Sequence, residues 1–188
     1  MKTFPYRRIA VVGTTGSGKS TLAEALAHRL HIPHVELDAL FWQPDWIESD
    51  WDEMRERVEE LTRGPAWVTD GNYSFCRDLI WGRAEAVIWL DYPLPLILWW
   101  LWRRTWARAL RRELLWGTNY ERLWSQFFSR DSIFLWALKT YRRRKEQYTR
   151  LAIQPENSHL KVFHFKSPRE TRAWLESLSD SKGVRMNY

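Results

Sequence analysis

The eight residues Gly13–Ser20 constrain the fold of this chain more strongly than any other segment. They read Gly-Thr-Thr-Gly-Ser-Gly-Lys-Ser, match the pattern G-x-x-x-x-G-K-[ST], and lie between an apolar run at residues 9–12 and a helical pattern that starts at Lys19. Glycines at these positions let backbone N–H groups turn inward around phosphate oxygens, while the following helix directs its positive end at the same oxygens. The segment therefore predicts a phosphate-binding loop with contacts at Gly13, Thr14, Thr15, Gly16, Ser17, Gly18, Lys19, Ser20 and Thr21.

The same pattern indicates how ATP and its metal ion would be held. Lys19 is expected to reach the β- and γ-phosphates, and the Ser20 hydroxyl is expected to ligate Mg²⁺. Asp70 ends a later apolar run and would hold the same ion directly or through water. ATP hydrolases typically carry a glutamate directly after such an aspartate to orient water, whereas Gly71 stands here. The sequence thus favours phosphoryl transfer to an organic acceptor over hydrolysis.

Apolar runs alternate with helical patterns along the whole chain, which is typical of a parallel sheet covered by helices. In a helix predicted at residues 49–63, Ser49 is expected to cap the N-terminus, and Trp51, Met54, Val58 and Leu61 repeat at core spacing. Another helix is predicted at residues 19–31, and a last one opens at Ser167. The fold class is α/β, in one domain spanning residues 1–188, with five strands at residues 9–12, 34–37, 66–69, 86–90 and 160–165.

Composition excludes several classes of protein. The chain has 188 residues, of which 45% are apolar and 28% charged, which is enough to fill a core and argues against disorder. Cys76 is the single cysteine and cannot form an internal disulfide, and the N-terminal residues lack the apolar region of a signal peptide, so the cytoplasm is the expected compartment. Asp91, Pro93 and Pro95 interrupt the apolar stretch at residues 87–102, so no transmembrane segment is expected.

Two further patterns have an ordinary structural interpretation beside a functional one. Between Arg103 and Arg150, thirteen Lys and Arg residues stand against four Asp and Glu residues, which predicts either a solvated helical face or a group of cations that meets phosphate. His28, His31 and His34 have a spacing that suggests a metal site, but no cysteine or carboxylate cluster accompanies them. The histidines are therefore not expected to bind a metal ion.

Several pieces of the chain together resemble a known family. They are the glycine loop, the strand end Leu90–Pro93, an arginine-rich insertion before the last strand, and the stretches Leu37–Trp42 and Asp70–Ser74. These pieces resemble the nucleoside monophosphate kinases of the P-loop class, and within that class the adenylate-kinase-like branch labelled DNA topology modulation proteins. The resemblance covers nearly the whole chain, roughly residues 7–178.

The resemblance implies a three-layer P-loop NTPase fold with helices on both faces of the sheet. It also implies an acceptor-binding segment at about residues 38–64 and a helical, arginine-rich lid at about residues 103–150. Lid arginines would close over the phosphates and neutralise charge on the transferred group, and the expected residues are Arg103, Arg104 and Arg108, followed by Arg112. Ser167, at the start of the last helix, lies where the family often holds the adenine ring.

The sequence departs from this family directly after Asp70 and Gly71. Adenylate kinases continue there with Phe-Pro-Arg, whose arginine grips the phosphate of the acceptor, whereas this chain continues with Asn72, Tyr73 and Ser74. Either Arg77 replaces that arginine one turn later, or the acceptor carries no phosphate. In the second case Asp38 would take a proton from an acceptor hydroxyl, unless it only caps a helix or turn.

Two classes of function fit these observations. The first is a Mg²⁺-dependent ATP phosphotransferase of the adenylate-kinase-like class that acts on a nucleotide or another small hydroxyl compound. The second is an ATP-binding regulatory protein associated with nucleic acid, suggested by a sequence pI near 9.6, by basic and aromatic residues that interleave at residues 99–112, and by the family label. The kinase is favoured because lid arginines account for the basic cluster and the sequence carries no nucleic-acid-binding motif.

Overall fold

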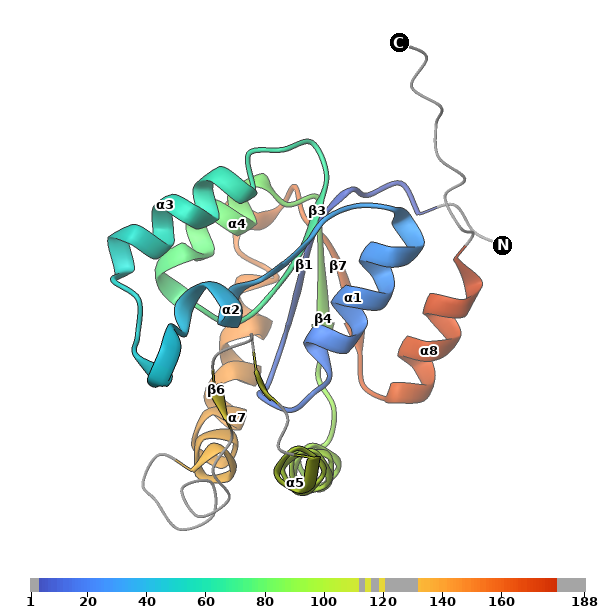
Figure 1. Ribbon diagram of the computed structural model, residues 1–188. Coiled ribbons are helices and arrows are strands. Elements are labelled where there is room, and N and C mark those ends of the chain that lie inside the picture. The colour runs from blue at the N-terminus through green and yellow to red at the C-terminus, as the bar shows by residue number, and fades with distance from the viewer. Residues whose placement is uncertain (1–3, 112–113, 116–118, 121–131, 179–188) are drawn as a thin grey trace.

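A five-stranded parallel sheet forms the centre of the molecule (Figure 1). The computed structural model describes residues 4–111, 114–115, 119–120 and 132–178. The strand order is β2-β3-β1-β4-β7, and every neighbouring pair is parallel. This sheet confirms the predicted α/β class and all five predicted strands, which are β1 (Arg8–Gly13), β2 (His34–Glu36), β3 (Trp67–Asp70), β4 (Ala86–Leu90) and β7 (Lys161–Phe165).

Helices cover both faces of this sheet and its carboxyl edge, where the strands end. In Figure 1, α1 and α8 lie on one side, α3 and α4 lie on the other, and α5 and the near end of α7 lie below the sheet. A small antiparallel pair, β5 (Leu114–Leu115) and β6 (Asn119–Tyr120), follows α5. The helices are α1 (Lys19–Leu30), α2 (Leu37–Phe41), α3 (Trp51–Leu61), α4 (Arg77–Arg83), α5 (Leu94–Arg111), α7 (Ile133–Leu151) and α8 (Pro168–Ser177), with short 3₁₀ turns at Pro44–Trp46, Ser74–Cys76 and Pro155–Asn157.

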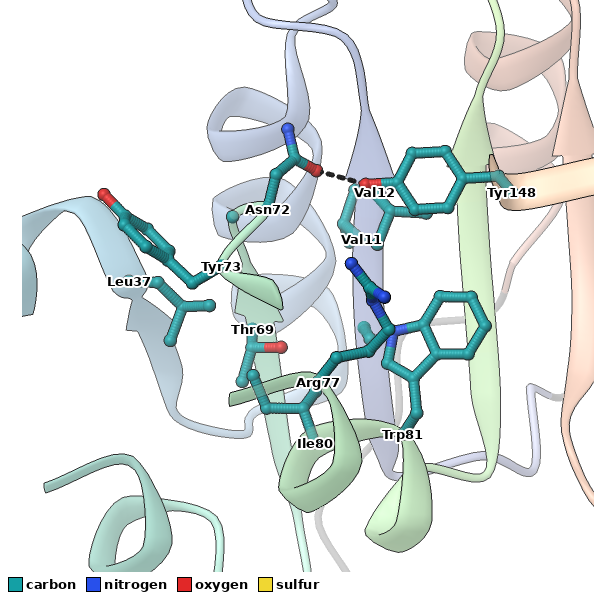
Figure 2. A pocket seen from close by; sticks show the side chains of 12 residues that line it. Val11, Val12, Leu37, Thr69, Asn72, Tyr73, Arg77, Ile80, Trp81 and Tyr148 are labelled. Carbon is teal, nitrogen blue, oxygen red and sulfur yellow. Dashed lines mark hydrogen bonds between the residues drawn. The ribbon is translucent and has the colours of Figure 1, made fainter. Parts of the chain in front are cut away.

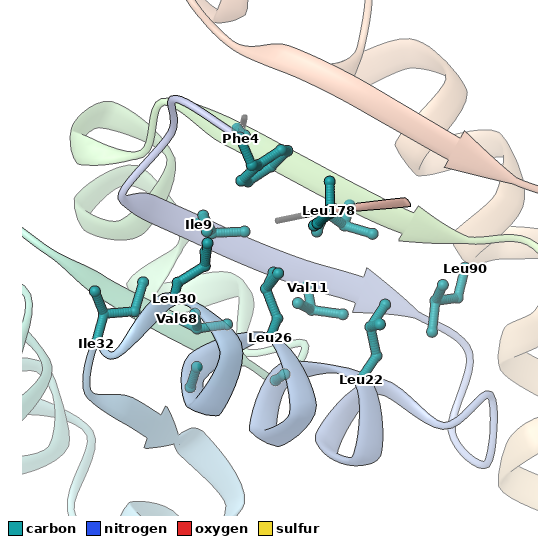
Figure 3. Close-up of a cluster of buried hydrophobic side chains, with 14 of the residues drawn as sticks. Phe4, Ile9, Val11, Leu22, Leu26, Leu30, Ile32, Val68, Leu90 and Leu178 are labelled. Carbon is teal, nitrogen blue, oxygen red and sulfur yellow. The ribbon is translucent and has the colours of Figure 1, made fainter. Parts of the chain in front are cut away.

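The central strand β1 is apolar on both faces because both faces are covered. Ile9 and Val11 pack with helix α1 in one buried cluster, and Ala10 and Val12 belong to a second cluster on the other side of the sheet. Figure 3 shows the first cluster, in which residues of α1 lie against β1. The predicted apolar face of α1 is confirmed, since Leu22, Ala23, Leu26 and Leu30 are all buried.

Helix α3 differs from its prediction at both ends. Asp50, not Ser49, caps it, because the Asp50 carboxylate accepts hydrogen bonds from the Asp52 and Glu53 amides at 2.9 and 3.2 Å. Ser49 is buried instead and donates to the Leu40 carbonyl.

The predicted apolar stripe of α3 is also shorter than expected. Met54 and Val58 are buried, whereas Trp51 and Leu61 are 61% and 46% exposed. These two are the first and last residues of the helix, and they lie beyond the part of α3 that packs against the core through Met54 and Val58. The ring of Trp51 stacks on Phe75 instead, with centroids 5.2 Å apart.

The expected lid begins inside a longer helix. Helix α5 starts at Leu94, at the end of the sheet, and continues through Arg103 to Arg111. The side chain of Arg108 and the whole of Arg112 lie outside the described residues. Within the described residues, none of the helices combines the length and apolar character that crossing a membrane requires.

Gly71, in the turn after β3, packs closely against α2, and a substitution there tests this packing. Its φ is +140°, and a Cβ atom there would lie 2.8 Å from the Leu37 Cβ. Gly71→Ala is therefore expected to lower the free energy of unfolding, measured in urea, by about 1–3 kcal/mol. Gly64→Ala is the control, since its Cβ would meet no atom within 4 Å, and it should change stability by less than about 0.5 kcal/mol. Equal stability of the two variants would contradict the close approach of α2 to this turn.

Candidate functional site

The glycine loop forms an open set of amides at the start of α1. Gly13, Gly16 and Gly18 have φ values of +151°, +82° and +83°, which glycine adopts without the steric cost that other residues meet. Gly18 is the N-cap of α1, no side chain caps the helix, and its first turn carries no acidic residue. No acidic residue of α1 itself and no capping side chain occupies the positive end of the helix, which suits a phosphate group.

Lys19 is half-buried beside this loop. Its Nζ donates to the Thr14 carbonyl at 3.3 Å. Burial lowers the pKa of Lys19, the carboxylates of Asp38 and Asp70 raise it, and the positive charges of Arg144 and Arg104 lower it further. Lys19 thus lies in the field of two acids and two arginines, where an incoming phosphate would find an already positive environment.

Ser20 and Asp70, the two predicted metal ligands, lie in contact although they are 50 positions apart in the sequence. The Ser20 hydroxyl donates to Asp70 Oδ2 at 2.6 Å, next to the start of α1. Asp70 ends β3, and its side chain is 1% exposed. A hydroxyl and a carboxylate at this point form a pair of hard oxygen donors, which fits Mg²⁺.

Sequence reasoning missed the other partner of Asp70. His34 Nε2 lies 2.7 Å from Asp70 Oδ1. This hydrogen bond raises the pKa of His34. The contact arises because β2 pairs with β3 in parallel, with Glu36 opposite Asp70. A prediction of strand order would have been needed to find it.

Asp38 is the second carboxylate whose charge acts on Lys19. It belongs to the first turn of α2, and Tyr73 donates its hydroxyl to Asp38 Oδ1 at 2.6 Å. Burial, and then the charge of Asp38, raise the pKa of Tyr73 above its ordinary value, so Tyr73 stays a proton donor in this bond. The residue at the N-cap of α2 is Glu36.

Asn72 links the glycine loop to α7. Its Nδ2 donates to the Gly13 carbonyl at 2.7 Å, and Tyr148 of α7 donates to its Oδ1 at 2.6 Å. Figure 2 shows the second bond at the rim of a cavity of about 20 Å³. Arg77 and Trp81 of α4 line the same cavity, and the guanidinium group of Arg77 points into it (Figure 2). Such a volume holds a single water molecule.

Polar contacts of the buried Asp91 side chain tie α7 to the end of β4. Asp91, whose side chain is 4% exposed, lies 3.0 Å from both Lys145 Nζ and His164 Nε2. The neighbouring Arg144, which the sequence analysis did not single out, acts on Lys19, Tyr73 and Tyr148. The run of basic residues at 142–145 was the available sequence signal.

The remaining predicted residues lie in different surroundings. Arg104 is half-buried on α5 and Arg103 is exposed. Ser167 caps α8, as its pattern predicted, because its hydroxyl oxygen accepts from the Glu170 amide at 3.2 Å. Its role toward adenine stays a prediction. In the loop, Thr14 and Ser17 are buried, Thr15 is half-buried, and Thr21 is exposed on α1.

Comparisons with known proteins agree with this fold. A family model described as an AAA domain matches residues 9–73, which include the glycine loop and Asp70. The chain is 28% identical over 117 residues to the uncharacterized protein YqaC of Bacillus subtilis (strain 168), covering 61% of this chain and 66% of that protein, which is just under two thirds.

Two solved structures share the fold over nearly the whole chain. The shikimate kinase of Acinetobacter baumannii in complex with shikimate aligns with a TM-score of 0.55 and 17% identity, over 92% of this chain and 90% of its own. The shikimate kinase of Bacteroides thetaiotaomicron aligns with a TM-score of 0.53 and 16% identity, over 91% and 95%. The chain therefore has the P-loop kinase fold. The finer assignment to the topology modulation branch stays a prediction.

The link between α7 and the glycine loop predicts an effect on stability. Tyr148→Phe leaves Asn72 Oδ1 without its donor and should lower the free energy of unfolding by about 1–2 kcal/mol. Tyr6→Phe is the matched control, since the Tyr6 hydroxyl has no hydrogen-bond partner among the described residues. Urea unfolding of both variants provides the measurement, and equal midpoints would contradict the bond.

Proposed function

We propose that this protein is a Mg²⁺-dependent ATP phosphotransferase that acts on a small, anionic hydroxyl compound. The observation that carries the proposal is that two carboxylates held by different elements, Asp70 and Asp38, both act on Lys19 beside the glycine loop. Asp70 accepts from Ser20 at the start of α1, where ATP phosphates would bind, whereas Asp38 belongs to α2 and accepts from Tyr73. A phosphoryl donor and an acceptor need separate carboxylates of this kind, one for the metal ion and one for a proton.

The donor side has the parts that the phosphates of ATP require. The open amides at the start of α1 would cradle the phosphates, and Lys19 would move from the Thr14 carbonyl to the β- and γ-phosphate oxygens. Ser20 and Asp70 would hold Mg²⁺, which when bound neutralises charge on those phosphates. Arg104 and Arg144, which already act on Lys19, would stabilise charge on the transferred group.

Asp38 is the proposed general base of the acceptor side. Tyr73 binds its Oδ1, which holds the carboxylate in place and leaves Oδ2 for the acceptor. The acceptor oxygen would attack the γ-phosphorus while the bond from that phosphorus to the β–γ bridging oxygen breaks and ADP leaves. The hydroxyl proton passes to Asp38, so a neutral alcohol becomes a phosphate ester.

Two arginines support an anionic acceptor. Burial raises the pKa of Tyr148, whereas the positive charges of Arg144 and Arg77 lower it, so both guanidinium groups lie near this tyrosine. Arg77 points into the cavity beside Tyr148 and makes no hydrogen bond or ion pair with another described residue. Because this cavity has room for one water molecule only, a carboxylate or phosphate of the acceptor would pair with Arg77 once the side chains around it move apart. Shikimate, the ligand of one structure with the same fold, is also a hydroxy acid.

Lys19→Met tests the nucleotide site. The variant should lose the rise in melting temperature that ATP with Mg²⁺ produces in the wild type, because the main cation for the β- and γ-phosphates is gone. Lys161→Met is the control, since Lys161 is exposed at the first residue of β7, at the opposite edge of the sheet. An unchanged shift in Lys19→Met would contradict the site, and salt-sensitive DNA binding unaffected by this substitution would favour the nucleic-acid alternative.

Asp38→Asn tests the acceptor side. With a panel of hydroxy acids, sugar phosphates, nucleoside monophosphates and neutral polyols, wild-type protein should release ADP only with one anionic acceptor. Asp38→Asn should keep ATP binding but slow that release by about 10²–10⁴-fold, because the amide cannot take the proton. Asp45→Asn, an exposed position with φ of +63°, is the control and should behave as wild type. A full rate in Asp38→Asn would reject Asp38 as the base.

A further inference from the structure

We propose that His34 is a positioning residue for the Mg²⁺ form of ATP, an inference that rests on the function proposed above. His34 holds one oxygen of Asp70 so that the other oxygen stays directed at Ser20 and the carboxylate stays apart from Lys19. His34 itself would touch neither ATP nor the metal ion. Through His34 and Asp70, the edge strand β2 would then affect how the nucleotide site binds Mg²⁺.

Both oxygens of the buried Asp70 carboxylate are engaged. Oδ1 lies 2.7 Å from His34 Nε2, and Oδ2 accepts from the Ser20 hydroxyl at 2.6 Å. Rotation of the carboxylate would break both bonds at once. When Ser20 turns its hydroxyl oxygen toward a metal ion, only the His34 bond still fixes the plane of the carboxylate. A partner behind a metal ligand commonly has this function.

The competing partner for Asp70 is Lys19. This lysine is half-buried, and the charge of Asp70 raises its pKa, so the two groups attract each other. If Lys19 and Asp70 formed a direct ion pair, Lys19 would no longer be available to bind the phosphates, and Asp70 would no longer be available to bind Mg²⁺. Instead, Lys19 Nζ donates to the Thr14 carbonyl, and Asp70 Oδ1 faces His34. The His34 bond thus favours the arrangement in which both groups stay available.

This role needs no change in the charge of His34. A neutral imidazole with its hydrogen on Nε2 donates to Asp70, and so does the protonated ring. The strand register fixes where the ring lies, because His34 pairs with Val68 two residues before Asp70. The side chain is 20% exposed, so the bond forms at the margin of the core.

A purely structural His34 and a positioning His34 make different predictions. The structural role affects the stability of the β2–β3 pair alone. The positioning role affects how much Mg²⁺ strengthens ATP binding, a ratio that compares the same folded variant with and without the metal ion. This ratio, measured by calorimetric titration with ATP in excess Mg²⁺ and in EDTA, separates the two roles independently of catalytic turnover.

The experiment uses four variants of the full chain. In His34→Ala, the enhancement of ATP affinity by Mg²⁺ should fall about 10–100-fold, while affinity in EDTA changes less than about threefold. His34→Gln should regain most of the enhancement, because its side-chain amide has the length to donate to Asp70 Oδ1. His34→Asn is one methylene shorter and should behave like His34→Ala, which keeps the test available if the alanine variant does not fold. His28→Ala, an exposed histidine on α1, should match the wild type.

Each contrary result has a distinct meaning. A wild-type enhancement in His34→Ala or His34→Asn, even with reduced stability, would overturn the positioning role. Equal loss in His34→Gln and His34→Asn would also overturn it, since the hydrogen bond would not be the cause. If the wild type binds no ATP, or binds it equally with and without Mg²⁺, the proposed function itself fails and this inference fails with it.

Discussion

The buried carboxylate of Asp70 is the interaction on which the rest of the site depends. The Asp70 side chain is 1% exposed, so its carboxylate needs hydrogen-bond donors from neighbouring elements in place of water. Ser20 at the start of α1 and His34 on β2 supply them, so one side chain at the end of β3 joins the phosphate loop to the edge strand. The hydrogen bonds that stabilise Asp70 at this edge of the sheet therefore also bring together the residues of the proposed metal site.

A second network connects the loop to α7, which forms the last part of the predicted lid segment. Asn72, two residues after Asp70, bonds to both the Gly13 carbonyl and Tyr148. The Lys145–Asp91 ion pair holds α7 one turn earlier, and Arg144 lies next to that lysine. The position of this arginine near Lys19 is thus set by the contacts of two residues that follow it on α7. Helix α5 reaches the same loop from its own side, because Leu101 lies against Gly16.

The parts of the structure that local sequence encodes could be predicted, and the parts that depend on strand order could not. The glycine loop, the five strands and the capped start of α8 each follow from a few adjacent residues. Ser20 and Asp70 could be paired because carboxyl ends of parallel strands share one edge. His34 and Arg144 were missed because their contacts require the order of the strands and the path of α7. Trp51 was wrongly predicted to be a core residue, because the spacing of apolar residues does not show where a helix extends beyond the core.

The packing around Gly71 connects the choice of transfer over hydrolysis to the acceptor side. A Cβ atom at this position would lie 2.8 Å from Leu37 Cβ, so the residue after Asp70 has no room for the glutamate that hydrolases carry. Leu37 begins α2, and the next residue is Asp38. The close contact that removes a water-orienting side chain therefore also brings the proposed acceptor base to the turn after β3, where Tyr73 holds it. One steric constraint supports both halves of the proposed chemistry.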